Sequence, residues 1–472
     1  MILSLLLAYS AILIGIGLWM GRRVSGAKDF FVAGRRLGPG LLFSTMLAAN
    51  IGAGSTVGAT GLGYRDGVSA WWWVGSAAVG STALALWIGP AIRSCAAQHD
   101  LRTVGDFLEY RYGPSVRIVI AALLWIGSLA ILAGQLIAIA WILNVVIGFP
   151  KYAGCIVGGA VITAYFTAGG LLTSAWVNMV QLTVKLLGFA VALPLALRAA
   201  GGWNALAAAA PASSTFWSPW HGGASGWMYL AMLGPAFVVS PGLLQKIYGA
   251  RDDRAVRFGV GANAIGLLLY ASVPVLLGMI ARVRFPNLPS HELALPMILT
   301  YGVPPAVGAL GLAAVFSAEI SAADAVLFML TTSLSQDLYK RYLNPSADDR
   351  RMLSVTRAAA VASGVLGVLL AIVASTIIGV LSVFYTLLGV SLFVPIVAGL
   401  RLRRASTTEA LVSIVCGVAA MLVVQLSTRG DGYGWVTPAV AGVGAAFVGF
   451  ALTLMARLGR QMTVTPVARR IS

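Results

Sequence analysis

Cysteine, histidine and charged residues are scarce in this chain. It has 3 cysteines and 3 histidines among 472 residues. The cysteines are too few and too far apart for a disulfide framework or a cysteine-based metal site. They are Cys95, Cys155 and Cys416. No HExxH, GxSxG or Walker pattern occurs, and the histidines fall in expected loops, so the sequence does not predict an enzyme.

Charged residues make up only 10% of the chain, whereas 59% of it is hydrophobic. This composition excludes a soluble domain of this length. Apolar windows recur from end to end, each about 18 to 25 residues long, which is enough to cross the bilayer as a helix. The sequence therefore predicts an all-α polytopic membrane protein with about thirteen spans. The expected spans are 2–20, 39–62, 71–94, 117–147, 152–168, 174–199, 226–247, 259–281, 306–336, 355–374, 376–400, 408–427 and 435–457.

The basic residues are concentrated in alternate loops. The first span is followed by arginines rather than by a small-residue cleavage site, so we expect it to remain a span and not to act as a signal peptide. By the positive-inside rule, the loops rich in Lys and Arg are cytoplasmic. We therefore expect a multi-pass protein of the cell membrane with its N-terminus outside and its C-terminus in the cytoplasm. The basic segments are 22–36, 93–117, 246–257, 340–357, 401–404 and 457 onward.

The formal net charge of +17 raises the question of a nucleic-acid partner. The basic residues are spread over many loops beside membrane segments and form no single patch, so nucleic acid is not an expected partner. Membrane lipids with anionic headgroups are the expected counterpart of this charge.

Two expected spans carry residues that interrupt a helix. The second contains AANIGAGSTVGATGLG and the seventh contains MLGPAFVVSPGLLQ. Glycine lowers helix propensity and proline removes a backbone donor, so we expect breaks within 50–57 and 234–242. Paired interrupted spans are typical of transporters with inverted repeats. The alternative is that the glycines only allow close helix packing.

The whole chain is predicted to be one membrane transporter domain. The first five-helix repeat is expected at about 39–199 and the second at about 226–400. Peripheral helices are expected at 1–20, 408–427 and 435–457. The two longest outer connections, 200–225 and 282–305, are expected to act as lids, and the second to hold a short surface helix.

Several motifs, in this order, resemble those of the sodium/solute symporter family. They are DFFVAGRRLGP before the second span, LAANIGAGSTVG within it, TVGDFLEYRYG after the third, YFTAGGLLTSAWVNMVQ at the fifth and sixth, and SAEISAADAVLFMLTTSLSQDLYK in the ninth. The resemblance covers nearly the whole chain. It implies the five-plus-five inverted-repeat fold of the leucine-transporter type and cation-coupled symport of a small organic solute, with sodium as the family's ion.

The resemblance also implies a sodium site between the second and ninth spans. Carried over residue by residue, its ligands fall on Ala48, Ile51, Ala318 and Ser321, with one further position at Ala322. The family usually has a hydroxyl residue at that last position. Sodium is a hard cation that prefers about five oxygens, so the alanine removes one expected ligand. No cofactor is expected apart from this bound ion.

Two charged residues lie near the implied site. In the sixth span, Asn178 replaces an aspartate that supports a second cation in some family members, and Lys185 follows two helical turns later. In the ninth span, Glu319 flanks the implied ligands. Charge at bilayer depth is costly, so these residues are candidates for ion coupling, including proton coupling or ion-independent exchange. A static Lys185–Glu319 ion pair or a snorkelling lysine is the alternative.

Other polar residues in the spans have less specific roles. Asp324 is expected to pack helices by hydrogen bonding, with a role in coupling as the alternative. Gln135 either lines the pathway or bonds neighbouring helices. The run Trp71–Trp73 is expected in the interfacial belt, with a substrate cage as the alternative. The candidate substrate contacts are Gly52, Ala53, Gly54, Ser55, Thr56, Gln135, Pro235, Phe237 and Ser240.

The sequence thus favours a secondary active carrier that works by alternating access. The helix ends at the two breaks are expected to favour an anionic group such as a carboxylate on the solute. The alternative is a membrane sensor of the same fold that transports weakly and acts through a separate partner. The sequence specifies neither the solute nor the oligomeric state.

Overall fold

The computed structural model describes residues 35–167, 171–209, 214–220, 226–402 and 404–464, together with residues 12 and 15. Within these residues the chain is helical, with two isolated β-bridges. Ten stretches are long and apolar enough to cross a membrane, and residues 151–164 form a shorter apolar helix. The expected all-α membrane architecture is therefore confirmed. The first expected span, 2–20, lies almost entirely outside the described residues.

The helices of the two expected repeats follow each other along the chain. Those of the first are α3 (Pro39–Asn50), η2 (Gly54–Gly58), α4 (Ala59–Asp66), η3 (Gly67–Ala70), α5 (Trp71–Ala83), η4 (Leu84–Ile88), α6 (Gly89–Gln98), α7 (Val104–Tyr112), α8 (Pro114–Ile147), α9 (Lys151–Thr167) and α10 (Leu171–Ala199). Those of the second are α13 (Gly226–Val239), α14 (Pro241–Tyr248), α15 (Asp253–Tyr270), α16 (Ser272–Arg284), α18 (Pro305–Thr332), η6 (Ser333–Leu343), α19 (Asp349–Val373) and α20 (Ile377–Arg401).

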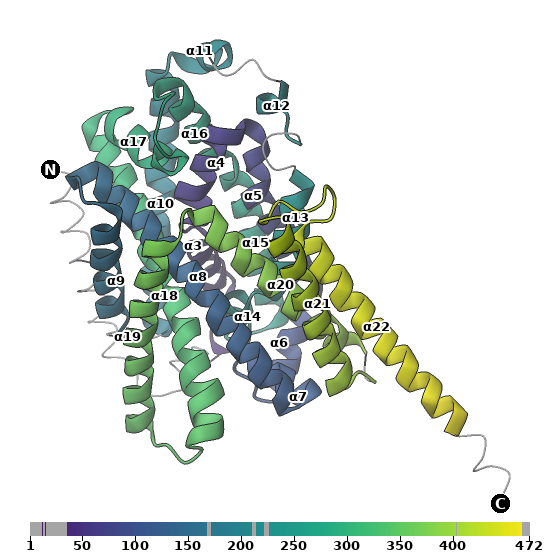
Figure 1. Ribbon diagram of the computed structural model, residues 1–472. Helices are drawn as coiled ribbons and strands as arrows, with labels where there is room; N and C mark the ends of the chain where they lie inside the picture. The colour runs from purple at the N-terminus through teal and green to yellow at the C-terminus, as the bar shows by residue number, and fades with distance from the viewer. Residues whose placement is uncertain are drawn as a thin grey trace, which may run out of the picture.

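The remaining helices lie outside these two sets. They are α11 (Gly202–Ala209), α12 (Ser214–Trp217), η5 (His291–Leu293), α17 (Ala294–Tyr301), α21 (Thr407–Ser427) and α22 (Pro438–Val464). Figure 1 shows α11, α12 and α17 at one end of the bundle, with α7 and the C-terminal end of α22 at the other. The connection 282–305 contains a helix as expected, α17, but five of its eight residues are buried, so it packs into the bundle and is not the surface helix that the sequence predicted.

Both expected helix breaks are present. The first falls between α3 and η2, where Ile51 leaves helical geometry with φ −91° and ψ 88°. The second is at Ser240, which has φ −55° and ψ 118° and separates α13 from α14. Pro241 contributes to this break because a proline cannot donate the backbone hydrogen bond that would continue α13. Each break exposes backbone groups that need partners in the middle of the bundle.

Some expected span limits differ from the observed helices. The eighth span was expected at 259–281, but α15 and α16 together cover 253–284. The extension at its start has a polar cause, because the Asp252 carboxylate caps α15 by accepting from the backbone N–H of Ala255 at 2.6 Å. An apolar window cannot detect such a polar first turn. The part of the second span after its break and the third span form one helical stretch over 54–98 that turns at Gly67, where φ is +71°.

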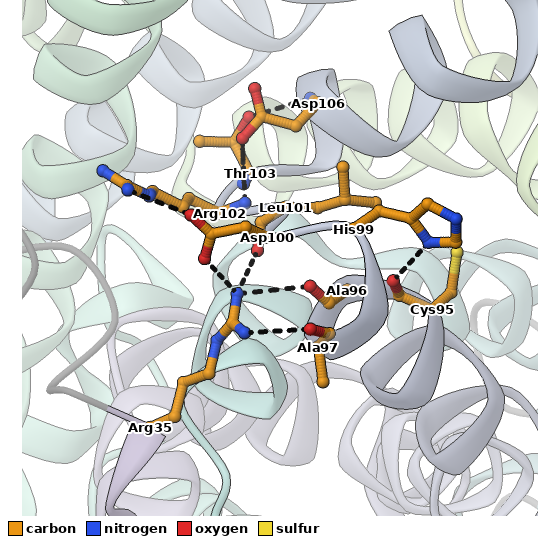
Figure 2. Close-up of polar contacts among 10 residues, drawn as sticks. All are labelled: Arg35, Cys95, Ala96, Ala97, His99, Asp100, Leu101, Arg102, Thr103 and Asp106. Atoms are coloured by element: carbon orange, nitrogen blue, oxygen red, sulfur yellow. Dashed lines mark hydrogen bonds and ion pairs between the residues drawn. The ribbon is translucent and has the colours of Figure 1, made fainter.

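Arg35, which precedes α3, contacts the end of α6 and the segment that leads into α7, at the end of the bundle where α7 lies. Figure 2 shows its guanidinium among the residues that end α6 and begin α7. It donates to the Asp100 carboxylate at 3.0 Å and to the backbone oxygens of Ala96 at 3.2 Å and Leu101 at 3.3 Å. Arginine near a helix C-terminus satisfies carbonyls that lack donors within the helix. This contact fixes the start of α3 against the end of α6.

The opposite end is anchored by Glu292 in η5. Its side chain is fully buried. One carboxylate oxygen accepts from Trp141 Nε1 at 2.8 Å, and the other accepts from the backbone N–H of Ile377 at 2.5 Å. The second contact places a negative charge at the N-terminus of α20, where the helix dipole favours it. Segment 282–305 is thereby tied to α8 and α20.

Helices α4 and α16 cross with almost no space between their backbones. A Cβ atom at Gly278 would overlap the carbonyl oxygen of Thr60 and lie 2.6 Å from the backbone nitrogen of Tyr64. One at Gly261 in α15 would have no atom within 4 Å. The packing role of glycine, considered above as an alternative to helix breaking, therefore applies at Gly278.

We predict that Gly278→Ala lowers the stability of the purified protein by about 1–3 kcal/mol, because the helices must separate to admit the methyl group. Gly261→Ala is the matched control and should leave the melting temperature unchanged or slightly higher. Thermal unfolding in detergent measures both. Equal melting temperatures for the two variants would contradict the observed crossing.

Candidate functional site

The end of α3 has two carbonyl oxygens without a helical donor. The backbone N–H of Gly52 donates to Ser55 Oγ at 3.0 Å and not to the carbonyl of Ala48, four residues before it. Ser55 Oγ in turn donates to the carbonyl of Asn50 at 2.8 Å. The break therefore leaves the carbonyl oxygens of Ala48 and Ile51 free to accept from elsewhere in the bundle.

Lys185 supplies the missing donors from α10, which packs against both α3 and α18. Its side chain is fully buried. The Nζ atom donates to the Ala48 carbonyl at 2.7 Å, to the Ile51 carbonyl at 3.2 Å and to Ser321 Oγ at 3.1 Å. The negative end of the α3 dipole also favours a cation at this position. Three of the four expected ion ligands thus bind the ammonium group of Lys185.

The other residues of the expected ion site lie beside this group on α18. Ala318 and Ala322 are both buried, one helical turn apart. Ala322 contributes no oxygen, and it packs so closely on Gly52 that a Cβ there would lie 2.5 Å from its own Cβ. The oxygens do not fit a bound sodium ion, because the ammonium nitrogen already occupies the point where three of them converge.

Glu319 faces a different partner. Its Oε1 atom lies 2.7 Å from Thr56 Oγ1, which also lies 2.9 Å from the carbonyl of Gly52. Its Oε2 atom is buried and has no hydrogen-bond partner within the described part of the chain. Among the described residues, no ion pair forms between Glu319 and Lys185, since the three donors of Lys185 point to the oxygens named above. Residue 178 belongs to α10, but its side chain lies outside what the structure describes.

A second buried lysine lies in α14. Lys246 is 5% exposed, and its Nζ donates to the carbonyl of Gly242 at 3.2 Å. Asp324 in α18 is close enough to act on it electrostatically. The sequence counted Lys246 in the basic segment 246–257, although the expected seventh span, 226–247, also reaches it; the structure places it in a helix with its side chain buried. The last turn of α14 is folded into the bundle, and apolar window limits do not report that burial.

A cavity lies between the two breaks, and of the two buried lysines Lys246 lines it whereas Lys185 does not. Six of the nine candidate substrate contacts line it: Gly52, Gly54, Ser55, Gln135, Phe237 and Ser240. Ala53, Thr56 and Pro235 are not part of the lining. Ala53 instead donates its backbone N–H to Gln135 Oε1 at 2.8 Å, so Gln135 both lines the cavity and ties α8 to the first break.

Aromatic side chains form much of the remaining cavity wall. Trp73 is 3% exposed and lines the cavity, so its expected place in the interfacial belt is wrong. Phe384 and Tyr385 of α20 also line it and were not identified from the sequence. The run of three tryptophans indicated a membrane interface because single-sequence patterns do not show which face of α5 turns inward.

Comparison with known proteins identifies the family. A model of the sodium:solute symporter family matches residues 30–417. The chain belongs to this family. It is therefore a multi-pass membrane transporter and not an enzyme, as the sequence motifs indicated.

The chain is similar to several characterised members of the symporter family. It is 28% identical to the sodium/pantothenate symporter of Escherichia coli (strain K12) over 446 residues, which cover 87% of this chain and 88% of that protein. It is 25% identical to the sodium/iodide cotransporter of Homo sapiens over 450 residues, covering 87% of this chain and 67% of that one. These relatives carry different solutes, so family membership does not specify the solute of this transporter.

Solved structures show the same fold. A Na⁺-coupled sialic acid symporter, in a substrate-bound outward-open state, matches with a TM-score of 0.79 at 17% identity and covers 96% of this chain and 97% of its own. Mhp1, a nucleobase-cation-symport-1 family transporter, matches with a TM-score of 0.62 at 14% identity, covering 93% and 96%. These matches confirm the expected fold class.

We predict that Ser321→Ala lowers uptake more than Asp324→Asn does. Among the described residues, Ser321 provides the only side-chain oxygen bound to the Lys185 ammonium, and losing a hydrogen bond to a charged group costs about 1.5–3 kcal/mol, or roughly tenfold or more in rate. Counterflow in proteoliposomes against labelled amino acids, monocarboxylates and sugars would first identify a solute. Near-wild-type uptake by both variants would show that this group of oxygens is not used.

Proposed function

We propose that this protein takes up a small organic solute in symport with protons, and that the ammonium group of Lys185 takes the place of the sodium ion. The observation that supports this is the set of three hydrogen bonds from Lys185 to Ala48, Ile51 and Ser321. They join the broken span to α10 and α18, which is the connection that the resemblance assigns to the ion. A positive charge held there covalently makes a free cation unnecessary.

The same oxygens can accommodate both protonation states of Lys185. A charged ammonium donates to all three, while the Ser321 hydroxyl donates to the Ala48 carbonyl at 3.1 Å. A neutral amine has two donors and one acceptor. It donates to the two carbonyls, and the Ser321 hydroxyl rotates to donate to the nitrogen. The proton can therefore leave Lys185 without leaving a buried donor unpaired.

Glu319 provides a second place for a proton at the same helix break. Thr56 has one hydroxyl hydrogen but lies within bonding distance of both the Gly52 carbonyl and Glu319 Oε1. A protonated Glu319 donates to Thr56, which then donates to Gly52, so both contacts are satisfied. An ionised Glu319 competes with Gly52 for that single hydrogen. Proton loss at Glu319 is thus coupled to the hydrogen bonding of the broken segment.

The orientation that we propose follows from the basic segments. Those around α7, between η6 and α19, and at the C-terminal end of α22 lie at the same end of the bundle (Figure 1). By the positive-inside rule this end would be cytoplasmic, and if the expected first span, 2–20, crosses the membrane once, the N-terminus would lie outside. The solute would then enter from the end that carries α11, α12 and α17.

We predict that uptake into proteoliposomes follows an inward proton gradient, and that replacing sodium with N-methyl-D-glucamine changes the rate by less than about twofold, since an ion that does not bind cannot be coupled to the solute. The membrane potential is clamped with potassium and valinomycin, and a pH-sensitive dye inside the vesicles records proton entry with the solute. Steep, saturable activation by sodium would contradict the proposal.

We also predict that Lys185→Met abolishes solute-driven proton entry and changes the pH profile of uptake, because the methionine cannot carry a proton and leaves Glu319 without its neighbouring cation. Lys340→Met, in the last turn of η6, is the matched control and should retain proton entry. If Lys185→Met kept the wild-type ratio of protons to solute, Lys185 would not be the coupling residue.

A further inference from the structure

Lys246 has no role in the coupling site, although it is a buried cation. We propose that it is the anion-binding residue of the central cavity, and that the transported solute is therefore a small organic monoanion with an apolar body. This inference rests on the proposed function in one respect: it takes the cavity between the two helix breaks as the place where the solute binds.

The Lys246 side chain faces the cavity with unused donors. It is one of the lining residues and follows the Ser240 break by six positions on α14. Its Nζ atom donates to one protein group, the Gly242 carbonyl at 3.2 Å. An ammonium group has three donors. In the part of the chain that the structure describes, the other two have no protein acceptor, so an acceptor within the cavity is the partner that remains.

The charge of the cavity lining is positive. Among the described residues that line it, Lys246 is the only one with a formal charge, and the polar ones include Asn50, Ser55, Gln135 and Ser240. Asp324 acts on Lys246 electrostatically but is not part of the lining. A buried cation without a hydrogen-bonded counter-ion is costly. A solute anion that contacts Nζ would remove this cost, whereas a neutral solute would leave it in place.

Four backbone donors at the two breaks are already bonded within the protein. At the first break, the N–H of Gly52 is taken by Ser55 Oγ and that of Ala53 by Gln135 Oε1. At the second, the N–H groups of Leu243 and Leu244 both donate to the Ser240 carbonyl. The helix ends were expected to bind the anionic group, but these four donors are satisfied within the protein and carry no formal charge. The side chain of Lys246 therefore carries the preference for an anion.

The aromatic residues of the cavity wall indicate the chemistry of the uncharged part of the solute. The ring of Tyr385 contacts those of Trp73 and Phe237, with centroids 6.1 Å and 5.5 Å away. Phe384 continues this wall on α20. An aromatic wall opposite a single cation suits a molecule with one charged end and an apolar body. A sugar lacks the charged end, and a polyanion lacks the apolar body.

The electric field of Lys246 can be measured without knowing the solute. Met329 lines the cavity, and its sulfur is close to Gly242, which accepts the Lys246 hydrogen bond. The test protein carries Met329→Cys with the native cysteines Cys95, Cys155 and Cys416 replaced by alanine. Its reaction rates with sulfonatoethyl and trimethylammonioethyl methanethiosulfonate are compared in detergent, and each is normalised to the same reagent's rate with free cysteine.

We expect the anionic reagent to be favoured and Lys246→Met to reduce the ratio of the two rates by about tenfold or more, as expected for removing one charge within several ångströms. Lys246→Arg should keep the ratio, and Lys340→Met should not alter it. A ratio that Lys246→Met leaves unchanged overturns the inference. The neutral reagent methyl methanethiosulfonate should also react with the Met329→Cys protein. A failure to react would likewise overturn the inference, since residue 329 would then not line an open cavity.

Binding then tests the class of solute with matched pairs of probes, benzoate with benzamide and isobutyrate with isobutyramide. In thermal unfolding of the full-length protein, we expect at least one carboxylate to raise the melting temperature while its amide does not, and Lys246→Met to remove the difference. Equal shifts within both pairs, or no shift with any probe, overturn the inference. The outcome is separate from the coupling proposal, because sodium-driven uptake of a carboxylate would contradict that proposal and leave this one standing.

Discussion

The arrangement of this transporter depends on two backbone carbonyls that the first helix break leaves without donors. Buried carbonyls in a membrane must find a partner, and a cation is the strongest one available at the C-terminal end of a helix. Here the partner is the Lys185 ammonium, which binds the carbonyls of Ala48 and Ile51 and the hydroxyl of Ser321. The break, α10 and α18 are therefore held together at one nitrogen atom.

This contact accounts for several neighbouring features. With a lysine at the centre of these oxygens, α18 does not need a second hydroxyl at Ala322, and that position packs on Gly52 instead. In the mechanism that we propose, the charge at this position belongs to a side chain and not to a free ion. Gain or loss of a proton at Lys185 would therefore make or break the contact. Glu319 and Thr56 extend the set of groups whose hydrogen bonds change with a proton. The central cavity then lies between this group and Lys246, which approaches from the other broken span.

The sequence predicted the parts of this picture that depend on local chemistry. The glycines after Asn50 and the prolines around Ser240 cannot sustain a continuous helix, so both breaks were placed correctly. Lys185 was noticed because charge is rare in such spans. Its partners were not: the sequence suggested Glu319, but a side chain's partner depends on helix rotation and on which backbone groups a break exposes. The resemblance supplied Ala48, Ile51 and Ser321 as a set, and geometry joined them to the lysine.

The sequence alone did not predict which side chains line the central cavity. Lys246 was counted among loop residues because it stands next to a basic segment, and Trp73 was assigned to the interface because tryptophans often lie there. Both are buried, which follows from how α14 and α5 fold against the rest of the bundle. Ala53, Thr56 and Pro235 lie at the breaks but do not face the cavity. Position near a break does not determine the direction of a side chain.

The central claim is that the oxygens of the expected ion site are bound by Lys185 and not by sodium. Equilibrium binding of radioactive sodium to the purified protein tests it most directly, with a sodium-coupled sialic acid symporter as the positive control. The account predicts no saturable sodium binding to the wild-type protein under conditions in which the control binds. Saturable binding to the wild type that Ser321→Ala weakens would contradict it.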